Sequence, residues 1–464
     1  MSSSAMRLTL LCLALVVATV SAAQQASRPL AAYGVSRSEV FALKAGQGLV
    51  VRPSAPARPG FVIGVEVYDS EKNLLGRDDD EVETPAFEWP APRDGRYYLV
   101  VRNFSPVAGG YTVDVVKPEG TRALRQTAEQ AVVKVFYATN RNQATSPSGS
   151  LTYQGELREG SDLALGVARV SVPRDHRMGE LEGPSILRLE FGQDPERHIV
   201  VRDIQPESAQ RFMESVRAAA SRTARKEAFV FVHGFATSFE DAVRRTAQIA
   251  YDLGFEGAPI LYSWPSQAKI GLLDYNRDAR NAELSAEPLK AFLQQIVAGA
   301  DLKTVHVIAH SMGNRVVAAA LDAVARDSRT QARLPLREIA LMAPDIDAQV
   351  FRTVADRIKG VPSRVTLYAS SGDEALVASQ RLAGYPRAGQ GGPDVLVMPG
   401  IDTIDASQVD TSLLGLGHSY YADNRTILSD LFYLLRGQGP QERASLQQRK
   451  NRNGTYWEFR PAAR

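Results

Sequence analysis

The sequence is poor in cysteine, since Cys12 is the only one among 464 residues. A single cysteine cannot form an intramolecular disulfide, so no disulfide framework supports the fold. Cys12 also lies early in an apolar run, with no small residues before it. A cysteine that receives a lipid anchor would follow such a run, which excludes lipoprotein processing.

The chain also lacks an excess of charge of one sign. It carries 54 Lys and Arg against 52 Asp and Glu, a net charge of +2. This balance offers no general electrostatic attraction to nucleic acid, and we expect no nucleic-acid partner. Apolar residues make up 44% and charged residues 23%, which excludes a wholly disordered chain, a collagen and a multi-span membrane protein. At about 150 residues per domain, the length suggests about three domains.

The N-terminal apolar run is shorter than an ordinary membrane span. It has 13 residues, from Leu8 to Val20, whereas a helical span needs about 20. Arg7 precedes the run, and small residues follow it at 21–23. The pattern predicts a signal peptide over residues 1–23, and hence export to the periplasm or the extracellular space. An uncleaved N-terminal anchor is the alternative. Removal of the signal would leave a mature protein without cysteine, suited to an oxidising compartment.

Residues 32–117 show short β patterns and no long helical period. The segments 48–52, 62–68 and 97–101 are rich in β-branched and aromatic residues, and turn residues separate them. Such spacing predicts a β-sandwich. The segments 67–69, 94–101 and 110–113 resemble the jelly-roll domains of the pre-peptidase C-terminal type, which are attached to secreted bacterial hydrolases. The resemblance implies a module that assists secretion, folding or attachment and carries no chemistry.

Three other segments complete the predicted domain organisation. The acidic run Asp78–Glu81 with Glu83 could bind calcium through oxygen ligands, but adjacent carboxylates are more typical of a solvated loop, and we expect no metal site. Residues 118–130 are predicted to be a linker. Residues 437–464 are predicted to be a basic tail, either solvated or docked on the surface, with contact to an anionic cell-envelope surface as the alternative.

Residues 131–436 alternate between strand-like and helix-like segments, which predicts a largely parallel α/β sheet. The most informative segment is Ala309-His310-Ser311-Met312-Gly313, which follows an apolar strand and precedes a helical pattern. This is the context of a nucleophile elbow, a tight strand–turn–helix that presents a serine above the sheet. The crowded turn requires small residues two positions before and after the serine. Ala309 and Gly313 meet that requirement, so Ser311 is the predicted nucleophile.

An activated serine needs a base to remove its proton and an acid to orient that base. His418 follows the last predicted strand, at 395–398, and precedes the last helix, where an α/β hydrolase places its base. Asp373 and Asp345 each follow a predicted strand and are both candidates for the acid. We favour Asp373, which has the more usual location. The predicted triad is therefore Ser311, Asp373 and His418, and it requires no cofactor.

The turn His233-Gly234-Phe235 follows a buried strand and is predicted to form the oxyanion hole with the elbow. The backbone N–H groups of Phe235 and Met312 would donate to the negative oxygen that develops during acyl transfer. The role belongs to the backbone, so the side chain of Phe235 should matter less than the conformation at Gly234.

These motifs together resemble a bacterial α/β-hydrolase family that is catalogued largely without known function. The likeness covers about 133–435 and rests on the segments 135–141, 172–182, 233–235, 262–266, 310–315, 343–345 and 417–418. It implies an α/β-hydrolase fold but names no substrate. Within these segments Tyr137, Asn140 and Arg141 stand outside the triad. They either border the active site or hold the extra N-terminal strands against it.

A serine nucleophile predicts an acyl-enzyme intermediate and hydrolysis of an ester, thioester or amide. The short connection 345–363 leaves no room for a large helical lid, and 266–287 could form a smaller rim with Ile270, Leu272, Leu273 and Tyr275 as its apolar wall. We therefore expect a carboxylesterase that accepts small-molecule or lipid-like esters with short or medium acyl chains. A lipase, peptidase or acyltransferase on the same triad is the alternative, as is a non-catalytic protein that binds the cell envelope.

Overall fold

The computed structural model describes residues 27–460 with gaps. The gaps are 32–33, 45–46, 55–62, 71–73, 79–86, 92–93, 104–106, 117–130, 147–148, 161, 174–175, 177, 180, 183–193, 328–333, 373–375, 377–378, 381–383 and 410–423. The predicted signal peptide, the linker, most of the acidic run, Asp373 and His418 therefore lie outside the described residues. The chain divides into two compact units, Met1–Leu124 and Arg125–Arg464.

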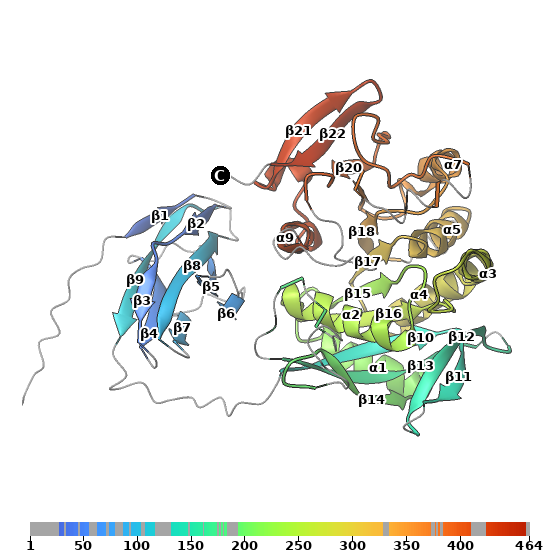
Figure 1. Cartoon of the computed structure of the whole chain (residues 1–464), viewed down its shortest axis with the longest axis horizontal. Helices are drawn as coiled ribbons and strands as arrows, with labels where there is room; N and C mark the ends of the chain where they lie inside the picture. Colours follow the sequence, from blue (N-terminus) through green and yellow to red (C-terminus); the bar gives the residue numbers. More distant parts are fainter. Residues whose placement is uncertain are drawn as a thin grey trace, which may run out of the picture. The chain divides into compact units, whose positions relative to one another are not determined.

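The N-terminal unit contains two antiparallel sheets with a shared apolar core. One sheet has the order β1-β9-β4-β7, and the other has the order β2-β8-β5-β6, with β3 paired to β8 (Figure 1). The strands are β1 (Arg28–Leu30), β2 (Val35–Arg37), β3 (Phe41–Leu43), β4 (Gly48–Pro53), β5 (Ile63–Asp69), β6 (Leu74–Asp78), β7 (Phe87–Pro90), β8 (Gly95–Asn103) and β9 (Gly109–Val116). Leu49, Val67, Leu99 and Val113 are buried between the sheets. The three predicted strand segments correspond to β4, β5 and β8.

The second unit is built on an eleven-stranded mixed sheet of order β14-β13-β10-β16-β15-β17-β18-β19-β20-β22-β21. Its central strands are parallel, from β10 through β20 to β22, and antiparallel strands occupy both edges. The strands are β10 (Ala131–Thr139), β13 (Ala164–Val172), β14 (Val200–Pro206), β15 (Glu227–Val232), β16 (Ala258–Ser263), β17 (Thr304–His310), β18 (Leu336–Met342), β19 (Arg364–Ala369), β20 (Asp402–Asp405), β21 (Leu446–Asn451) and β22 (Gly454–Phe459), and β11 (Arg141–Thr145) pairs separately with β12 (Leu151–Leu157). The predicted, mostly parallel α/β sheet is confirmed.

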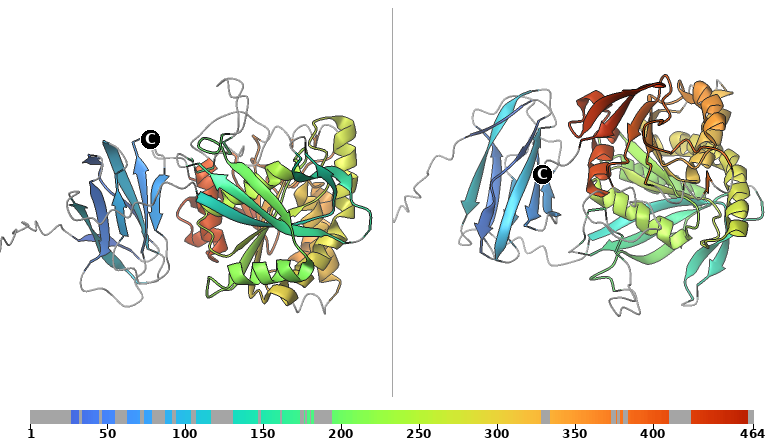
Figure 2. Two further views of the ribbon diagram at one scale, coloured as in Figure 1. Left: turned by 90° about the horizontal axis from the view of Figure 1, so that it is seen from below. Right: turned by 45° about the horizontal axis from the view of Figure 1, so that its top comes forward.

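Helices cover both faces of this sheet (Figure 2). Contacts join α1 to α4, α4 to α5 and α5 to α7 on one face, while α2 and α9 pack on the other. The helices are α1 (Ala209–Ala220), α2 (Phe239–Asp252), α3 (Leu272–Leu284), α4 (Ala286–Ala300), α5 (Gly313–Ala325), α7 (Ala348–Ile358) and α9 (Asn424–Leu435). Among the described residues, no helix is long and apolar enough to cross a membrane.

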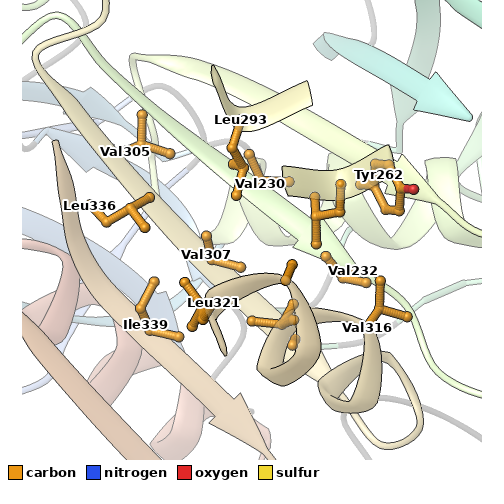
Figure 3. Close-up of a cluster of buried hydrophobic side chains, with 14 of the residues drawn as sticks. Val230, Val232, Tyr262, Leu293, Val305, Val307, Val316, Leu321, Leu336 and Ile339 are labelled. Atoms are coloured by element: carbon orange, nitrogen blue, oxygen red, sulfur yellow. The ribbon is translucent and has the colours of Figure 1, made fainter. Parts of the chain in front are cut away.

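The main core lies between the sheet and the layer formed by α1, α4, α5 and α7. Val230 and Val307 from the strands meet Leu293 of α4 and Val316 and Leu321 of α5 (Figure 3). These strand segments are buried on both faces, which explains why they are continuous apolar runs in the sequence. The core holds the carboxyl ends of β15 and β17 firmly in place, and the loops that follow these two strands carry the predicted site.

One strand predicted from the sequence is not present in this unit. The strand predicted at 395–398 is not formed; Met398 makes only an isolated bridge with Ile401, and the strand is β20. Val395 and Leu396 are buried in a loop, which explains why the sequence has an apolar pattern like that of a strand here. Pro399 cannot donate a ladder hydrogen bond, and Gly400 has φ 81°, so the chain turns before the strand begins.

The C-terminal segment 437–464 is not simply a tail. It forms a short 3₁₀ helix (Pro440–Glu442) and then β21 and β22, and β22 pairs in parallel with β20. Arg443 is buried, forms a 2.6 Å ion pair with Asp430 of α9, and donates to the Tyr368 hydroxyl at 3.2 Å. Phe459 is also buried. The buried ion pair and the added strands make this segment part of the domain.

Candidate active site

The strand–turn–helix geometry predicted for the elbow is present at the junction of β17 and α5. Ser311 has φ 49°, in the left-handed region that residues other than glycine rarely adopt. Its N–H donates to the carbonyl of Met342 at 3.0 Å, and its carbonyl accepts from the Asp345 N–H at 3.2 Å. Strain of this kind persists only where the surroundings hold it, and it is typical of functional sites.

Two small residues make the elbow possible. Ala309 is fully buried in β17. A β-carbon built on Gly313 would overlap the carbonyl oxygen of His233 and lie 2.6 Å from that of Val232. Helix α5 therefore begins in contact with the end of β15, and only glycine fits there. No described residue forms a hydrogen bond with the Ser311 hydroxyl, which leaves it available to a base and a substrate.

The turn after β15 lies directly against the elbow. A β-carbon on Gly234 would lie 3.1 Å from the β-carbon of Ser311 and 2.9 Å from Nδ1 of His310. Within the described part of the chain, no acceptor takes the backbone N–H of Phe235 or of Met312. Two unpaired donors beside a serine hydroxyl are what an oxyanion hole requires.

His310 is next to the nucleophile in sequence but is a poor candidate for the base. Removal from water, together with the positive charge of Arg245, lowers the pKa of His310 to about 3. An imidazole with so low a pKa stays neutral and takes up a proton only weakly. This observation leaves His418, which lies outside the described residues, as the predicted base.

Asp345, the second candidate for the triad acid, has partners on both of its carboxylate oxygens. Its Oδ1 accepts from the Ser379 hydroxyl at 2.5 Å and lies 3.2 Å from Nε of Arg387. Its Oδ2 accepts from the Tyr275 hydroxyl at 2.7 Å and from Nη2 of Arg315 at 3.1 Å. Three hydrogen bonds and one ion pair therefore already engage the two oxygens of Asp345, among the described residues.

Asp373 lies outside the described residues, but the strand before it is well placed. Asp373 follows β19, which runs parallel to β17 with β18 between them. The carboxyl ends of parallel strands meet at one edge of a sheet, so β19 ends at the same edge as β17, which carries the elbow. Among the described residues, Ser311, Met312 and Phe235 lie close together. Asp373 and His418 lie outside the described residues, so their roles stay predictions.

The comparisons with known proteins agree with this architecture. Residues 208–435 match the family described as "Alpha/beta hydrolase of unknown function (DUF900)". This match agrees with the α/β-hydrolase fold of the second unit. No curated protein matches the chain.

Several solved structures are also similar. A putative cell surface hydrolase from Lactobacillus plantarum WCFS1 is 13% identical, with 47% of this chain and 96% of that chain covered and a TM-score of 0.30. A predicted CIB-like hydrolase from Thermoplasma acidophilum is 13% identical over 47% of this chain and 89% of that chain, with a TM-score of 0.26. PliG of Aeromonas hydrophila, a periplasmic inhibitor of g-type lysozyme, is 17% identical over 20% of this chain and 82% of that chain, with a TM-score of 0.16.

The structure shows the contacts of Arg141, whose role the sequence left open. Its guanidinium is buried and donates from Nη2 to the carbonyl of Thr237 at 2.8 Å and from Nη1 to that of Ser266 at 2.9 Å. Ser266 in turn donates to Asp278 at 2.6 Å and accepts from the N–H of Thr237 at 3.0 Å. Arg141 therefore links the turn after β15 to the loop after β16.

The rim of the hydrolase differs from the prediction. Ile270, Leu272 and Leu273 are 76%, 56% and 84% exposed, so they point to solvent and do not form a wall. Tyr275 does border the site, because its ring lies 5.4 Å from that of Phe235 in an edge-to-face contact. The apolar pattern that suggested a wall belongs to the exposed beginning of α3.

No group of three or more His, Cys, Asp or Glu in the described residues of either unit is arranged to hold a metal ion. The buried acidic groups near the site have other partners. Asp278 accepts a hydrogen bond from the N–H of Ala236 in the turn after β15. Burial raises the pKa of Asp278, and hydrogen bonds from Ser266 and two backbone N–H groups act in the opposite direction. Asp278 therefore supports this turn through hydrogen bonds from Ser266, Gln267 and Ala236.

Proposed function

We propose that the chain is an exported serine hydrolase, specifically a carboxylesterase that acts on short or medium acyl esters. The observation that carries the proposal is the geometry at Ser311, which has a positive φ. Among the described residues, its hydroxyl has no partner, and the N–H groups of Phe235 and Met312 beside it have no acceptor. The match of 208–435 to an α/β-hydrolase family supports the same conclusion.

In this proposal the Ser311 hydroxyl attacks the ester carbonyl while His418 accepts its proton. The N–H groups of Phe235 and Met312 stabilise the oxyanion of the tetrahedral intermediate. His418 then protonates the departing alcohol, and Asp373 orients the imidazole. A water molecule, activated in the same way, hydrolyses the acyl-enzyme and releases the acid. The hydrogen bonds and the ion pair that already engage both oxygens of Asp345 support the choice of Asp373.

The test is hydrolysis of nitrophenyl acetate and butyrate by the purified protein. We expect turnover by the native chain and a loss of about 10⁴-fold or more in Ser311→Ala, since removal of a triad member leaves only binding and oxyanion stabilisation. Ser221→Ala, at the exposed end of α1, is the matched control and should leave the rate unchanged. A folded native protein that releases no nitrophenol from either ester would contradict the proposal.

A lipase is a second candidate, and the exposed start of α3 favours it. Ile270, Leu272 and Leu273 form an outward apolar group next to Tyr275, which itself contacts Phe235. Exposed apolar groups of this kind are typical of surfaces that meet lipid. If the substrate is emulsified, Leu272→Ser with Leu273→Ser should lower the rate on long-chain emulsified esters and leave the rate on soluble esters intact. Equal rates on both substrates would favour the esterase.

Export and contact with the cell envelope are further parts of this proposal. Residues 1–23 support export through their signal-peptide pattern. A purely envelope-binding protein without catalysis is the opposing hypothesis. Secretion of the full chain followed by N-terminal sequencing tests export, because a mature protein that begins near residue 24 supports cleavage and an intact Met1 contradicts it.

A further inference from the structure

The histidine before the oxyanion turn has partners on both ring nitrogens. His233 is buried at the end of β15, and its ring stacks on that of Trp264 at 5.1 Å and 16°. Its Nε2 lies 3.2 Å from Nη2 of Arg141 and 3.1 Å from the Ser263 hydroxyl. Its Nδ1 lies 2.9 Å from the carbonyl oxygen of Gly234.

These partners determine which nitrogen carries the proton. A guanidinium has only N–H donors, so Nε2 of His233 must accept from Arg141. Burial and the positive charge of Arg141 lower the pKa of His233 well below its ordinary value, so the imidazole is neutral. A neutral imidazole has one N–H, which is therefore on Nδ1 and donates to the Gly234 carbonyl. Ser263 does not oppose this assignment, since its oxygen accepts from Nε of Arg141 at 2.8 Å.

The carbonyl of Gly234 and the N–H of Phe235 belong to the same peptide unit. In a planar trans peptide these two groups point in opposite directions. A hydrogen bond that holds the carbonyl on the side of His233 therefore also fixes the direction of the Phe235 N–H. Gly234 packs against Ser311, so this N–H is fixed next to the nucleophile.

We propose that Arg141 and His233 are positioning residues, which orient the oxyanion-hole N–H of Phe235 through the hydrogen bond from Nδ1 of His233 to the carbonyl of Gly234. The inference rests on the proposed function, because that function makes the Phe235 N–H an oxyanion donor. Neither side chain touches the substrate in this account. Arg141 selects the tautomer of His233, and His233 holds the peptide.

Arg141 is suited to this role by its surroundings. Every guanidinium nitrogen has an acceptor: Ser263 for Nε, the carbonyls of Gln154 and Ser266 for Nη1, and His233 with the carbonyl of Thr237 for Nη2. A buried charge is costly unless its donors are satisfied, and here neutral acceptors do so. The same Nη2 thus holds both ends of the turn 233–237, which contains the positive φ of Ala236, 53°.

The first test observes the tautomer directly in the native protein. Imidazole ¹⁵N spectra of histidine-labelled protein at neutral pH distinguish the protonated nitrogen, and the His233→Asn variant assigns the signal. We expect a neutral His233 with its proton on Nδ1. A proton on Nε2, or a charged ring, would overturn the proposal. This result does not depend on catalysis, so it stands even if the ester assay fails.

The second test compares two variants of similar shape. The amide nitrogen of His233→Asn can occupy the place of Nδ1 and donate to Gly234, whereas His233→Leu has no donor. Loss of one oxyanion donor costs about 10²-fold to 10³-fold in kcat, so His233→Leu should lose about 100-fold in kcat with KM unchanged, while His233→Asn stays within about tenfold of the native rate. A purely structural role predicts equal losses in both variants that follow their thermal stability, and that outcome would contradict the proposal.

Arg141→Lys completes the comparison, because lysine keeps the charge but not the planar fork of donors. We expect a fall in kcat with little change in KM, and an unchanged extent of covalent labelling at Ser311 by a fluorophosphonate after long incubation. If a variant does not fold, the ¹⁵N result on the native protein decides. Absence of ester turnover in the native protein would refute the proposed function, while a Nε2 proton would refute the positioning inference alone.

Discussion

Substitution of Gly313 by alanine tests the close contact on which the elbow depends. The added β-carbon would overlap the carbonyl oxygen of His233 and lie 2.6 Å from that of Val232. An ordinary carbon–oxygen contact is about 3.3 Å, so α5 and the end of β15 must separate by roughly 1 Å. Both oxygens belong to the backbone, and no flexible side chain can move aside.

The magnitude follows from this displacement. The carbonyl of His233 directly precedes the oxyanion turn, so relief of the overlap moves the Phe235 N–H away from Ser311. A misplacement of about 1 Å can cost about 10²-fold in rate, and overpacking of this kind costs about 1–3 kcal/mol of stability. Helix propensity alone would favour alanine by about 1 kcal/mol, so the predicted sign is opposite to that of an unconstrained helical glycine.

The assay combines kcat on nitrophenyl butyrate with the free energy of unfolding in urea. Gly360→Ala is the matched control, because a β-carbon there meets nothing within 4 Å and its φ is not positive. We expect the control to keep both the rate and the stability of the native chain. If Gly313→Ala hydrolyses the ester at the native rate and unfolds at the native urea concentration, the close packing of α5 on β15 does not exist as described.

Three further predictions concern groups around the sheet. Asp373→Asn should lower kcat by about 10⁴-fold with stability intact, whereas Asp345→Asn should chiefly lower the free energy of unfolding, since it leaves two arginines underpaired; the reverse pattern would exchange their roles. Burial alone would lower the pKa of His176, but Asp252 and Glu182 raise it to about 10. The stabilisation that His176→Gln removes should therefore be complete below pH 6.5 and shrink as the pH rises to about 10, and a pH-independent difference would contradict it. Arg443→Met should cost about 3–5 kcal/mol in urea unfolding, because it leaves Asp430 buried without its partner, and a loss under 1 kcal/mol would show that the C-terminal strands are held otherwise.

The sequence predicted those parts of the site that depend on local geometry. The elbow could be recognised because Ala309 and Gly313 satisfy a steric requirement within five consecutive residues of a strand–turn–helix pattern. The order of strand and helix segments likewise predicted the parallel sheet, since strands buried on both faces are continuous apolar runs. Family resemblance then extended this to the fold of the whole domain.

The parts that were missed depend on contacts between residues distant in the chain. Arg141 meets Ser263 and Thr237, which are 122 and 96 positions away, so nothing in its own neighbourhood reveals its role. The C-terminal strands were read as a tail because their polar, basic residues fit an edge strand as well as a solvated segment. Their place is decided by the pairing of β22 with β20 and by the ion pair of Arg443 with Asp430.

Covalent labelling determines whether Ser311 is a catalytic nucleophile. The native protein is incubated with a fluorophosphonate, digested, and mapped by mass spectrometry. We expect one adduct, on the peptide that contains Ser311, and no adduct in the Ser311→Ala variant. An adduct on another residue, or no adduct on a protein shown to be folded, would contradict it.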